Sequence, residues 1–493
     1  MMLNKLIQDI PVRDFQCELG ELKVDIRGVT HDSRRVEKGF LFVAIEGEEQ
    51  DGHRFIPDAI QRGAAAVVVS RPVEPPPKIP QLVVDDARRA LAAISARFYE
   101  HPSLQLRVIG VTGTNGKTTL TYLLESILNE AGRRPAVLGT INYRFGGKTF
   151  PALNTTPESA DLQELLSAMV RQGVTDLVME VSSHALAMER VRGVHFDAAL
   201  FTNLSQDHLD YHGNLEDYFR AKLKLFAEIL PESAKREKFA VLNMEEERSE
   251  TVLQQSSATR IRTGLTGPYE VSCRSFQLSE EGIQALVTVG TEVLEVRSPL
   301  LGRFNLENIL LAIGAAHALG VPKEAILTGL EKMQSVPGRL EKIPNRRGIL
   351  VFVDYAHTPE ALARVGENLR KLARGRVITV FGCGGDRDRS KRPLMGREAA
   401  LFSDFVIVTS DNPRTENPET IIDEILPGLE EVGYPKNHLF RVTSREEALK
   451  KAVELAREGD LILAAGKGHE DYQIVGKKKF HFSDQEVLKR LLG

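Results

Sequence analysis

The segment 106–132 constrains the fold more than any other part of the sequence. LRVIGVT (106–112) is an unbroken apolar run of the kind expected for a parallel strand that is buried on both faces. Glycines and then a helical pattern, KTTLTYLLESILNEAG (117–132), follow it directly. Because a strand, a loop and a helix in this order form a nucleotide-binding unit of parallel sheets, we expect an α/β fold.

The loop between this strand and helix departs from the strict phosphate-loop pattern GxxxxGK[ST], because Val111 stands where the first glycine would be. The remaining loop still offers main-chain N–H groups around an anion, a lysine charge and a hydroxyl for magnesium. An ordinary glycine turn that caps a helix is the alternative, but the lysine and threonine positions favour an ATP site. The loop residues are Gly113, Thr114, Asn115, Gly116, Lys117, Thr118 and Thr119.

Length and composition predict a soluble protein of about three domains. No apolar stretch approaches the roughly 20 residues of a membrane span, and the N-terminus has no export signal, so we expect a cytoplasmic location. The formal net charge of -4 gives no general attraction to nucleic acid. Three cysteines without CxxC spacing (Cys17, Cys273, Cys383) are read as small buried side chains. We expect a monomer.

Strand-like runs and breaks suggest domains at 1–103, 104–336 and 337–493. The first unit reads as a small α/β domain in which the proline-rich piece 71–80 is a surface loop. The stretch 260–298 has strand-like segments without long helices and is read as a smaller sheet. The last unit alternates buried strands with helices expected from Pro359, Arg392 and Pro418, which predicts a doubly wound, Rossmann-like domain.

Polar side chains follow two further buried strands of the central unit. MEVSSHAL (179–186) supplies Glu180 and His184, and FTNLSQDHLDYHG (201–213) supplies Asn203, Asp207, His208 and His212. Parallel sheets bind ligands at the carboxyl ends of their strands, so these groups could hold magnesium between ATP and an acidic substrate. For any single histidine, packing or capping is the favoured reading. Ser182, Ser183 and His184 do not reproduce a serine-hydrolase nucleophile elbow.

A series of motifs along nearly the whole chain resembles the Mur ligase family. The motifs are TGTNGKTT, EVSSHAL, NLSQDHLDYHG with YFRAKLKLF, GRFNLENILLAIGAA, VPGRLE, DYAHTPEAL, GCGGDRDRSKRP, DNPRTENP and AAGKGHEDYQ. The family version of the loop, TGTNGKT, also lacks the outer glycine. The resemblance implies three domains that bind a UDP-sugar, ATP and an amino acid. It also implies an amide ligase that phosphorylates the D-glutamate γ-carboxylate of UDP-MurNAc-L-Ala-D-Glu and couples an amine to it, in peptidoglycan precursor synthesis.

The resemblance also implies roles for individual residues. Lys117 would neutralise ATP; Thr118 and Glu180 would hold one Mg²⁺, and His208 a second. Lys222 matches a lysine that the family carbamoylates with CO2, although the sequence alone favours a solvated helix lysine with Lys224 as its neighbour. Further ATP contacts would be Asn305, Asn308, Arg339, Asp354 and His357, and Arg339, in a hinge, would reach ATP only when the domains close. The UDP-MurNAc-dipeptide would contact Ser33, Asn154, Thr155, Thr156, Ser182 and Arg190.

DNPRTENP (411–418) bears on the amino acid that is added. A turn at this segment would explain its prolines but not Arg414. The planar guanidinium of Arg414 suits the distal carboxylate that meso-diaminopimelate has and lysine lacks. In the family, DNPR marks the diaminopimelate enzymes. The implied contacts are Arg387, Asp411, Asn412, Pro413, Arg414, Gly466 and Glu470. A lysine-adding Mur ligase, a folylpolyglutamate-synthetase-like ligase and a nucleotide-gated binding protein remain the alternatives.

Overall fold

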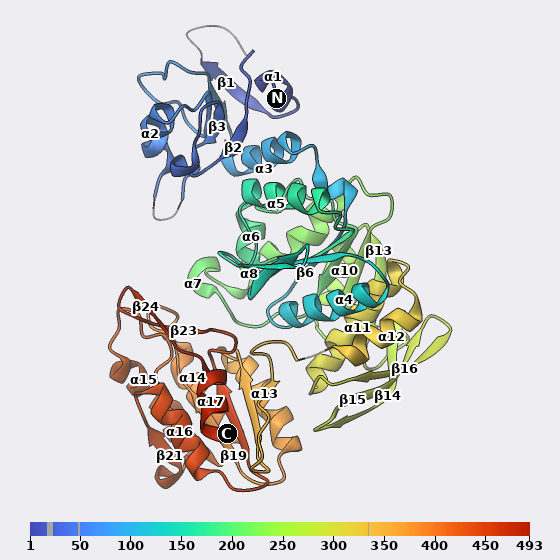
Figure 1. The fold of residues 1–493 in the computed structure, drawn as a ribbon, viewed down its shortest axis with the longest axis vertical. Coiled ribbons are helices and arrows are strands. Elements are labelled where there is room, and N and C mark those ends of the chain that lie inside the picture. The colour runs from blue at the N-terminus through green and yellow to red at the C-terminus, as the bar shows by residue number, and fades with distance from the viewer. Residues whose placement is uncertain (17–22, 48–49, 334) are drawn as a thin grey trace.

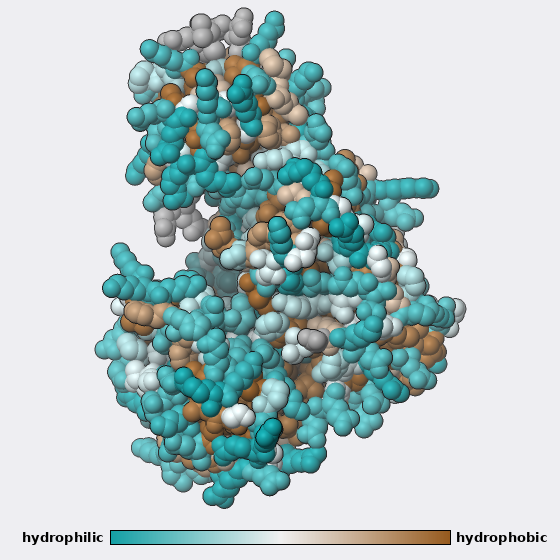
Figure 2. All heavy atoms as spheres, viewed as in Figure 1, coloured by the Kyte–Doolittle hydropathy of each residue, from teal (hydrophilic) through white to brown (hydrophobic). Residues whose placement is uncertain are grey.

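The protein consists of three α/β domains, each built around its own sheet, in a computed structural model (Figure 1). The structure describes residues 1–16, 23–47, 50–333 and 335–493. The N-terminal domain forms one lobe above the central domain, and the C-terminal domain lies beside the central domain on the opposite side (Figure 1). A recess separates the first and last lobes on the face shown in Figure 2.

The N-terminal sheet has the strand order β1-β5-β4-β3-β2, with β1 as its antiparallel edge. Helix α3 (Ala87–Phe98) packs against α5 (Ser159–Arg171) of the central domain, and Arg35 forms an ion pair with Glu164 across the same boundary. The proline-rich piece 71–80 is the predicted loop between two strands. The elements are α1 Leu3–Leu6, β1 Val12–Gln16, β2 Gly28–Thr30, β3 Phe40–Val43, α2 Ile56–Gln61, β4 Ala66–Val69 and β5 Gln81–Val84, with 3₁₀ turns at Ser33–Arg35, Gly52–Phe55 and Pro102–Gln105.

The central sheet comprises eleven strands within the described ranges, in the order β16-β15-β14-β13-β12-β11-β6-β10-β7-β8-β9. Its middle is parallel, and β6 lies between β10 and β11, so the loops that follow these three strands meet at one edge. The strands are β6 Arg107–Thr112, β7 Pro135–Leu138, β8 Asn142–Phe145, β9 Lys148–Pro151, β10 Asp176–Glu180, β11 Ala198–Phe201, β12 Phe239–Asn243, β13 Thr259–Gly264, β14 Val271–Ser279, β15 Gly282–Val289 and β16 Glu292–Ser298.

The segment 260–298 does not form a smaller sheet of its own, which corrects the sequence reading. Strand β13 pairs in parallel with β12, so β14, β15 and β16 extend the central sheet as an antiparallel wing. The apolar inner face of this wing packs on α11, which the sequence pattern alone could not show. The helices are α4 Lys117–Glu130, α5, α6 Ser183–Ala187, α7 Leu209–His212, α8 Leu215–Lys224, a π-helical turn Leu225–Ile229, α9 Leu230–Glu232, α10 Ser249–Gln255, α11 Arg303–Ala318 and α12 Lys323–Lys332.

The C-terminal sheet has the order β17-β18-β22-β19-β20-β21 and is parallel except for β17, with helices on both faces. Helices begin at Pro359 and Pro418 as predicted, and at Lys391, one residue before the predicted Arg392. The elements are β17 Glu341–Lys342, β18 Leu350–Asp354, α13 Pro359–Leu372, β19 Val377–Phe381, α14 Lys391–Phe402, β20 Phe405–Val408, α15 Pro418–Glu431, a 3₁₀ turn Lys436–His438, β21 Leu439–Arg441, α16 Arg445–Leu455, β22 Leu461–Ala465, β23 Tyr472–Val475, β24 Lys478–His481 and α17 Asp484–Leu492.

Two of the three cysteines, Cys273 and Cys383, are buried and unpaired, as expected of small core side chains. Cys17 lies outside the described residues. Among the helices of the described chain, none is both long and apolar enough to cross a membrane.

Candidate active site

The loop after β6 is held in a fixed shape by the loop after β11. Asn203 accepts from the main-chain N–H of Thr114 through its carbonyl (2.8 Å) and from that of Asn115 through its side-chain oxygen (2.9 Å). Gly113 and Gly116 have positive φ, and a Cβ at Gly116 would lie 2.5 Å from Asn308 Oδ1. Only glycine fits both the backbone angle and this close approach. Contacts within the protein therefore set the shape of the phosphate-type loop.

Two lysines converge on the carbonyl of Gly113 inside this loop. Lys117 Nζ lies 2.9 Å from Gly113 O and 2.7 Å from Thr114 O, and Lys222 Nζ lies 2.7 Å from Gly113 O. Neither lysine takes part in an ion pair in the portions of the chain that the structure describes. Lys117, whose ammonium is bonded to main-chain carbonyls and to no carboxylate, favours an anion such as a triphosphate.

Lys222 is buried, with 1% of its surface exposed, so the reading of it as a solvated helix lysine is wrong. Helix α8 turns it inward, and its Nζ lies 4.3 Å from the centre of the Tyr218 ring. Burial and the nearby charge of Lys117 bring the pKa of the Lys222 ammonium well below its usual value. Lys224, on another face of the helix, forms an ion pair with Glu189 (3.3 Å). Lys222 and Lys224 differ because they lie on different faces of α8, and the sequence alone did not show which face is buried.

Glu180 ends β10 and points at the start of α4. Its carboxylate accepts from Thr118 Oγ1 (3.0 Å), Thr140 N (2.9 Å) and Thr140 Oγ1 (3.0 Å), and it is 1% exposed. A buried carboxylate and a hydroxyl are the hard oxygen donors that Mg²⁺ prefers. The residues of this structure therefore fit a magnesium ion at Thr118 and Glu180.

The histidines predicted near the strand ends form one aromatic group. The ring of His184 lies 4.8 Å from that of His208 and 5.4 Å from that of His212. Burial is the main reason that the pKa of His208 and of His212 falls to about 4, so both imidazoles are neutral at pH 7. His208 lines the same cavity as Lys117, Glu180 and Lys222, whereas His212 bonds to Ser183 (3.0 Å). Of these three histidines, His208 is thus placed to face a ligand beside the phosphate loop, where His357 of the C-terminal domain also lines the cavity.

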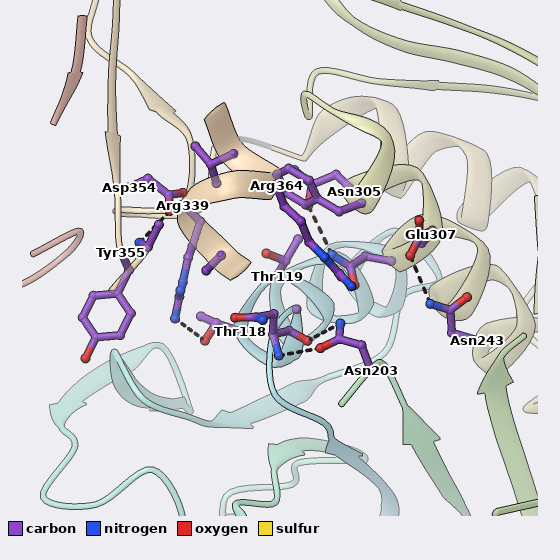
Figure 3. A pocket seen from close by; sticks show the side chains of 17 residues that line it. Thr118, Thr119, Asn203, Asn243, Asn305, Glu307, Arg339, Asp354, Tyr355 and Arg364 are labelled. Atoms are coloured by element: carbon purple, nitrogen blue, oxygen red, sulfur yellow. Dashed lines mark hydrogen bonds between the residues drawn. The ribbon is translucent and has the colours of Figure 1, made fainter. Parts of the chain in front are cut away.

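A slot beside the phosphate loop is lined by residues of α11 and of the C-terminal domain, among them Asn305, Glu307 and Arg364 (Figure 3). Asn305 and Asn308 come from α11, whereas Ala361 and Val365 come from α13 of the C-terminal domain. Thr118 and Thr119 lie at its base (Figure 3). Such a slot suits a flat nucleobase whose phosphates extend to the loop.

Arg339 reaches from the hinge to the phosphate loop. Its Nη2 lies 3.5 Å from Thr118 Oγ1, and its guanidinium stacks 4.6 Å from the centre of the Tyr355 ring (Figure 3). Asp354, at the end of β18, accepts from the main-chain N–H groups of Leu340 and Ala356, both at 2.7 Å. The central and C-terminal domains are therefore already close enough for Arg339 to approach a phosphate.

A cavity of about 800 Å³ joins the central and C-terminal domains next to this slot. From the central domain it is lined by Asn154, Thr155, Ser182, Arg190 and His208. From the C-terminal domain it is lined by His357, Arg387, Asp411, Asn412, Arg414, Gly466 and Glu470. The groups predicted for the muramoyl dipeptide and for the amino acid thus face a single space, adjoining the loop of Lys117.

The wall formed by the C-terminal domain is held together by ion pairs of Arg392, near the start of α14, and by hydrogen bonds between its loops. Arg392 is fully buried and binds Glu416 (2.8 Å) and Glu424 (2.5 Å), and its Nη2 also reaches Gly384 O (3.2 Å). Arg414, at φ 51°, donates to Gly385 O (2.7 Å). These contacts tie the loop of GCGGDRD to that of DNPRTENP.

The remaining predicted residues lie at or behind these walls. Thr156 is buried and donates to the Glu180 carbonyl (2.8 Å), and Pro413 lies behind Arg414, against Gly385. Ser33 is buried in the N-terminal domain and is not among the residues that line the cavities described here. The sequence reasoning missed Tyr355, Arg364, Lys391 and Lys467, although three of them stand inside the quoted motifs.

Comparison with known proteins agrees with this arrangement. Family models match residues 25–99 (Mur ligase family, catalytic domain), 111–316 (Mur ligase middle domain) and 338–468 (Mur ligase, glutamate ligase domain). The fold and the site define an ATP-dependent amide ligase, and the chain belongs to the Mur ligase family.

Two similar proteins are named UDP-N-acetylmuramoyl-L-alanyl-D-glutamate--2,6-diaminopimelate ligase. One, from Geobacter metallireducens, is 48% identical over 95% of this chain and 94% of its own; the other, from Geobacter sulfurreducens, is 45% identical over 98% and 96%. A solved structure of the same name is 32% identical, with a TM-score of 0.71, and covers 100% of this chain and 98% of its own. A Mycobacterium tuberculosis folylpolyglutamate synthase, 18% identical with a TM-score of 0.62, shares the fold over 76% of this chain and 91% of its own.

Proposed function

We propose that this ligase adds meso-2,6-diaminopimelate to the D-glutamate γ-carboxylate of UDP-MurNAc-L-Ala-D-Glu at the expense of ATP, in cytoplasmic peptidoglycan precursor synthesis. The observation that carries the proposal is the cavity that Arg414 and Glu470 share with Asn154, Ser182 and Arg190. An amino acid and a muramoyl dipeptide would meet there, beside the loop of Lys117.

The domains would divide the work. Residues 1–103, which include Ser33, would hold the UDP end, residues 104–336 would hold ATP, and residues 337–493 would hold the amino acid. The chain would act as a monomer.

The chemistry requires two negatively charged reactants to meet. An oxygen of the D-glutamate γ-carboxylate attacks the γ-phosphorus of ATP, and ADP leaves. Lys117 and the main-chain N–H groups of the loop would neutralise the phosphates and align them with the carboxylate. A magnesium ion held by Thr118 and Glu180, with His208 near a second one, would supply further positive charge. Arg339 would contact the nucleotide from the hinge.

The resulting acyl phosphate is then attacked by the amine of the amino acid. The new C–N bond forms as the C–O bond to phosphate breaks, and the nitrogen loses a proton. Glu470 would accept from the distal ammonium of diaminopimelate, and Arg414 would bind its distal carboxylate in a two-point contact. L-Lysine would leave Arg414 without that partner, which disfavours it.

Lys222 would act as a carbamate. The lowered pKa of Lys222 favours the uncharged amine, which is the form that attacks CO2. The nitrogen bonds to the carbon of CO2 and loses a proton, which gives an anion. This anion would lie in the cavity that Lys222 shares with Glu180 and would help to bind magnesium. Burial supports this role because it keeps the amine away from competing water.

An acceptor assay tests the function. The purified protein is given UDP-MurNAc-L-Ala-D-Glu, ATP and Mg²⁺ with either meso-diaminopimelate or L-lysine, and the product is identified by mass. We expect the diaminopimelate adduct, with little lysine adduct. Release of phosphate without any peptide product would instead favour a nucleotide-gated binding protein, and preferred use of lysine would identify a lysine-adding ligase.

A further inference from the structure

Lys467 lies beneath the wall of the amino-acid pocket and has no part in the reaction as described above. It stands in AAGKGHE, between Gly466 and Glu470, and none of its surface is exposed. A buried ammonium is costly unless carboxylates or other acceptors surround it. The partners of Lys467 therefore indicate what it is for.

All of these partners belong to residues proposed to bind diaminopimelate. Lys467 Nζ lies 3.1 Å from Glu470 Oε2, 3.3 Å from Asn412 Oδ1 and 3.9 Å from Asp411 Oδ1. Asn412 Nδ2 donates to the same Glu470 oxygen (2.8 Å). One lysine thus joins the loop after β20 to the loop after β22.

The contact with Lys467 also sets the orientation of the Asn412 amide. Asn412 Oδ1 accepts from both Lys467 Nζ and Ile474 N (2.9 Å), so this oxygen faces two donors. The Nδ2 group must then point toward Glu470, where the hydrogen bond is found. Removing the ammonium would leave the Glu470 carboxylate with one donor fewer and beside the charge of Asp411.

Two glycines hold Lys467 in place. Gly466 and Gly468 have φ values of 108° and 53°, which side chains rarely adopt. A Cβ on Gly466 would lie 2.7 Å from Asp411 Oδ2, and one on Gly468 would lie 2.6 Å from Tyr355 Cβ. The main chain on both sides of Lys467 is therefore fixed against the pocket and the hinge-side aromatic ring.

We propose that Lys467 is a positioning residue for the incoming amino acid, which it serves by orienting Glu470 and Asn412 and by offsetting one of the two carboxylate charges. The inference rests on the proposed function. The cluster contains the two carboxyl groups of Asp411 and Glu470 and the one amine of Lys467, so its formal charge is one negative, which matches the single distal ammonium of diaminopimelate. Without Lys467, the carboxylates of Asp411 and Glu470 would repel each other. A proton bound to one of them would then take the place of the substrate's ammonium.

The test measures steady-state kinetics of Lys467→Met, which keeps the length of the side chain and removes its charge. We expect the KM for diaminopimelate to rise at least about tenfold, while the KM values for ATP and for UDP-MurNAc-L-Ala-D-Glu stay within about twofold. Lys489→Met is the matched control, because this lysine is exposed on α17 of the same domain. An unchanged KM for diaminopimelate, or equal changes for all three substrates, would overturn the inference.

A double-mutant cycle separates positioning from a general effect on packing. Glu470→Gln removes the charge that Lys467 compensates, so adding Lys467→Met to it should change the KM for diaminopimelate far less than it does in the wild type. Multiplicative effects would refute the mechanism. If Lys467→Met alone does not fold, the comparison of Glu470→Gln with the double variant still decides, because the double variant contains no unpaired Glu470 charge.

The pH dependence gives a readout that packing alone would not move. Burial and the charge of Asp411 raise the pKa of Glu470, and Lys467 opposes this rise. Lys467→Met should therefore shift the acidic limb of kcat/KM for diaminopimelate to higher pH, while the limb for ATP stays in place. The charged or titratable groups that face Glu470 are Asp411, Tyr355, Arg445, Lys467 and Tyr472.

The wild-type reaction with diaminopimelate serves as the reference in each assay. If the wild type forms no adduct, the proposed function is wrong. If the wild type forms the adduct and the Lys467 variants behave like Lys489→Met, the function stands and only the inference fails.

Discussion

The phosphate-loop region and the amino-acid pocket each bury a lysine, but they treat its charge in opposite ways. Lys222 donates to the Gly113 carbonyl and forms no ion pair among the residues that the structure describes. Lys467 lies between Asp411 and Glu470 and bonds to the latter. Burial and the charge of Lys117 lower the pKa of the Lys222 ammonium well below its usual value, whereas Lys467 has carboxylates beside it that offset its charge.

This difference distinguishes the region proposed for phosphate transfer from the pocket proposed to select the amino acid. Around the phosphate loop, Lys117 is bonded to main-chain carbonyls and to no carboxylate, so its charge is left for an incoming triphosphate, and the main chain of the loop is fixed by Asn203. At the amino-acid pocket, Arg392 of α14 pairs with Glu416 of the loop after β20, and Lys467 pairs with Glu470 within the loop after β22. A site for ATP can hold an ammonium group that has no carboxylate partner in the protein. A site that selects one amino acid must instead hold each charged side chain in one orientation.

The largest effect is expected at the unpaired lysine. Lys222→Ala should lower kcat by about 10²–10³-fold, because it removes the proposed anion beside the transferred phosphate. Acetate or another short carboxylic acid should restore part of the activity by entering the space left by the side chain. Lys224→Ala, two residues on and paired with Glu189 instead, is the control. The absence of rescue would leave Lys222 as a buried cation and remove the carbamate from the mechanism.

A smaller effect is expected at the arginine proposed to read the distal carboxylate. Arg414→Lys keeps the charge but loses the planar two-point contact, which should reduce kcat/KM for diaminopimelate by about 100-fold, or ~2.7 kcal/mol. Steady-state rates with L-lysine should hardly change, because L-lysine never used that contact. Arg441→Lys is the matched control, since Arg441 pairs with Glu419 and Asp423 at the surface of the same domain. Unaltered kinetics would remove the basis for selectivity at Arg414.

Changing Arg392, whose ion pairs lie behind the amino-acid pocket, should reduce activity less than changing Arg414, which lines the pocket. Arg392→Lys would keep one contact to Glu416 or Glu424 and lose the fork that holds both, along with the bond to Gly384 O. We expect a loss of about 1–2 kcal/mol of stability and a severalfold rise in the KM for diaminopimelate. Thermal unfolding and steady-state kinetics measure the two effects. A stability loss without any change in KM would show that Arg392 supports the domain and not the pocket.

The sequence predicted which residues lie in these two regions better than it predicted the burial and the contacts of their side chains. Strand ends and motif order placed Lys117, Glu180 and Arg414, because buried apolar runs and glycine turns are local signals. The burial of Lys222 could not be predicted this way, since it depends on which face of α8 packs against the loop. The role of Lys467 depends on contacts with Asn412, 55 positions earlier. Such contacts follow from strand order, which local patterns do not contain.

The central sheet shows the same limit. The segment 260–298 was correctly expected to form strands, but the pairing of β13 with β12 makes it part of the main sheet. Pairing partners are chosen by long-range packing of the wing on α11, and the alternation of residues in a strand does not specify a partner.

The pairing of charges in the amino-acid pocket predicts a pH dependence that the phosphate-loop lysines would not produce. The hydrogen bonds of Arg392 bring the pKa of Glu416 from 4.5 to about 2. A carboxylate with a lowered pKa stabilises the fold above its unfolded pKa and loses this contribution as the pH falls through the folded pKa. Wild type and Glu416→Gln should therefore differ most in stability above pH 5 and converge near pH 2. Hydrogen exchange of α14 measures this difference locally, and a gap that persists at pH 2 would mean that Glu416 acts through packing instead of charge.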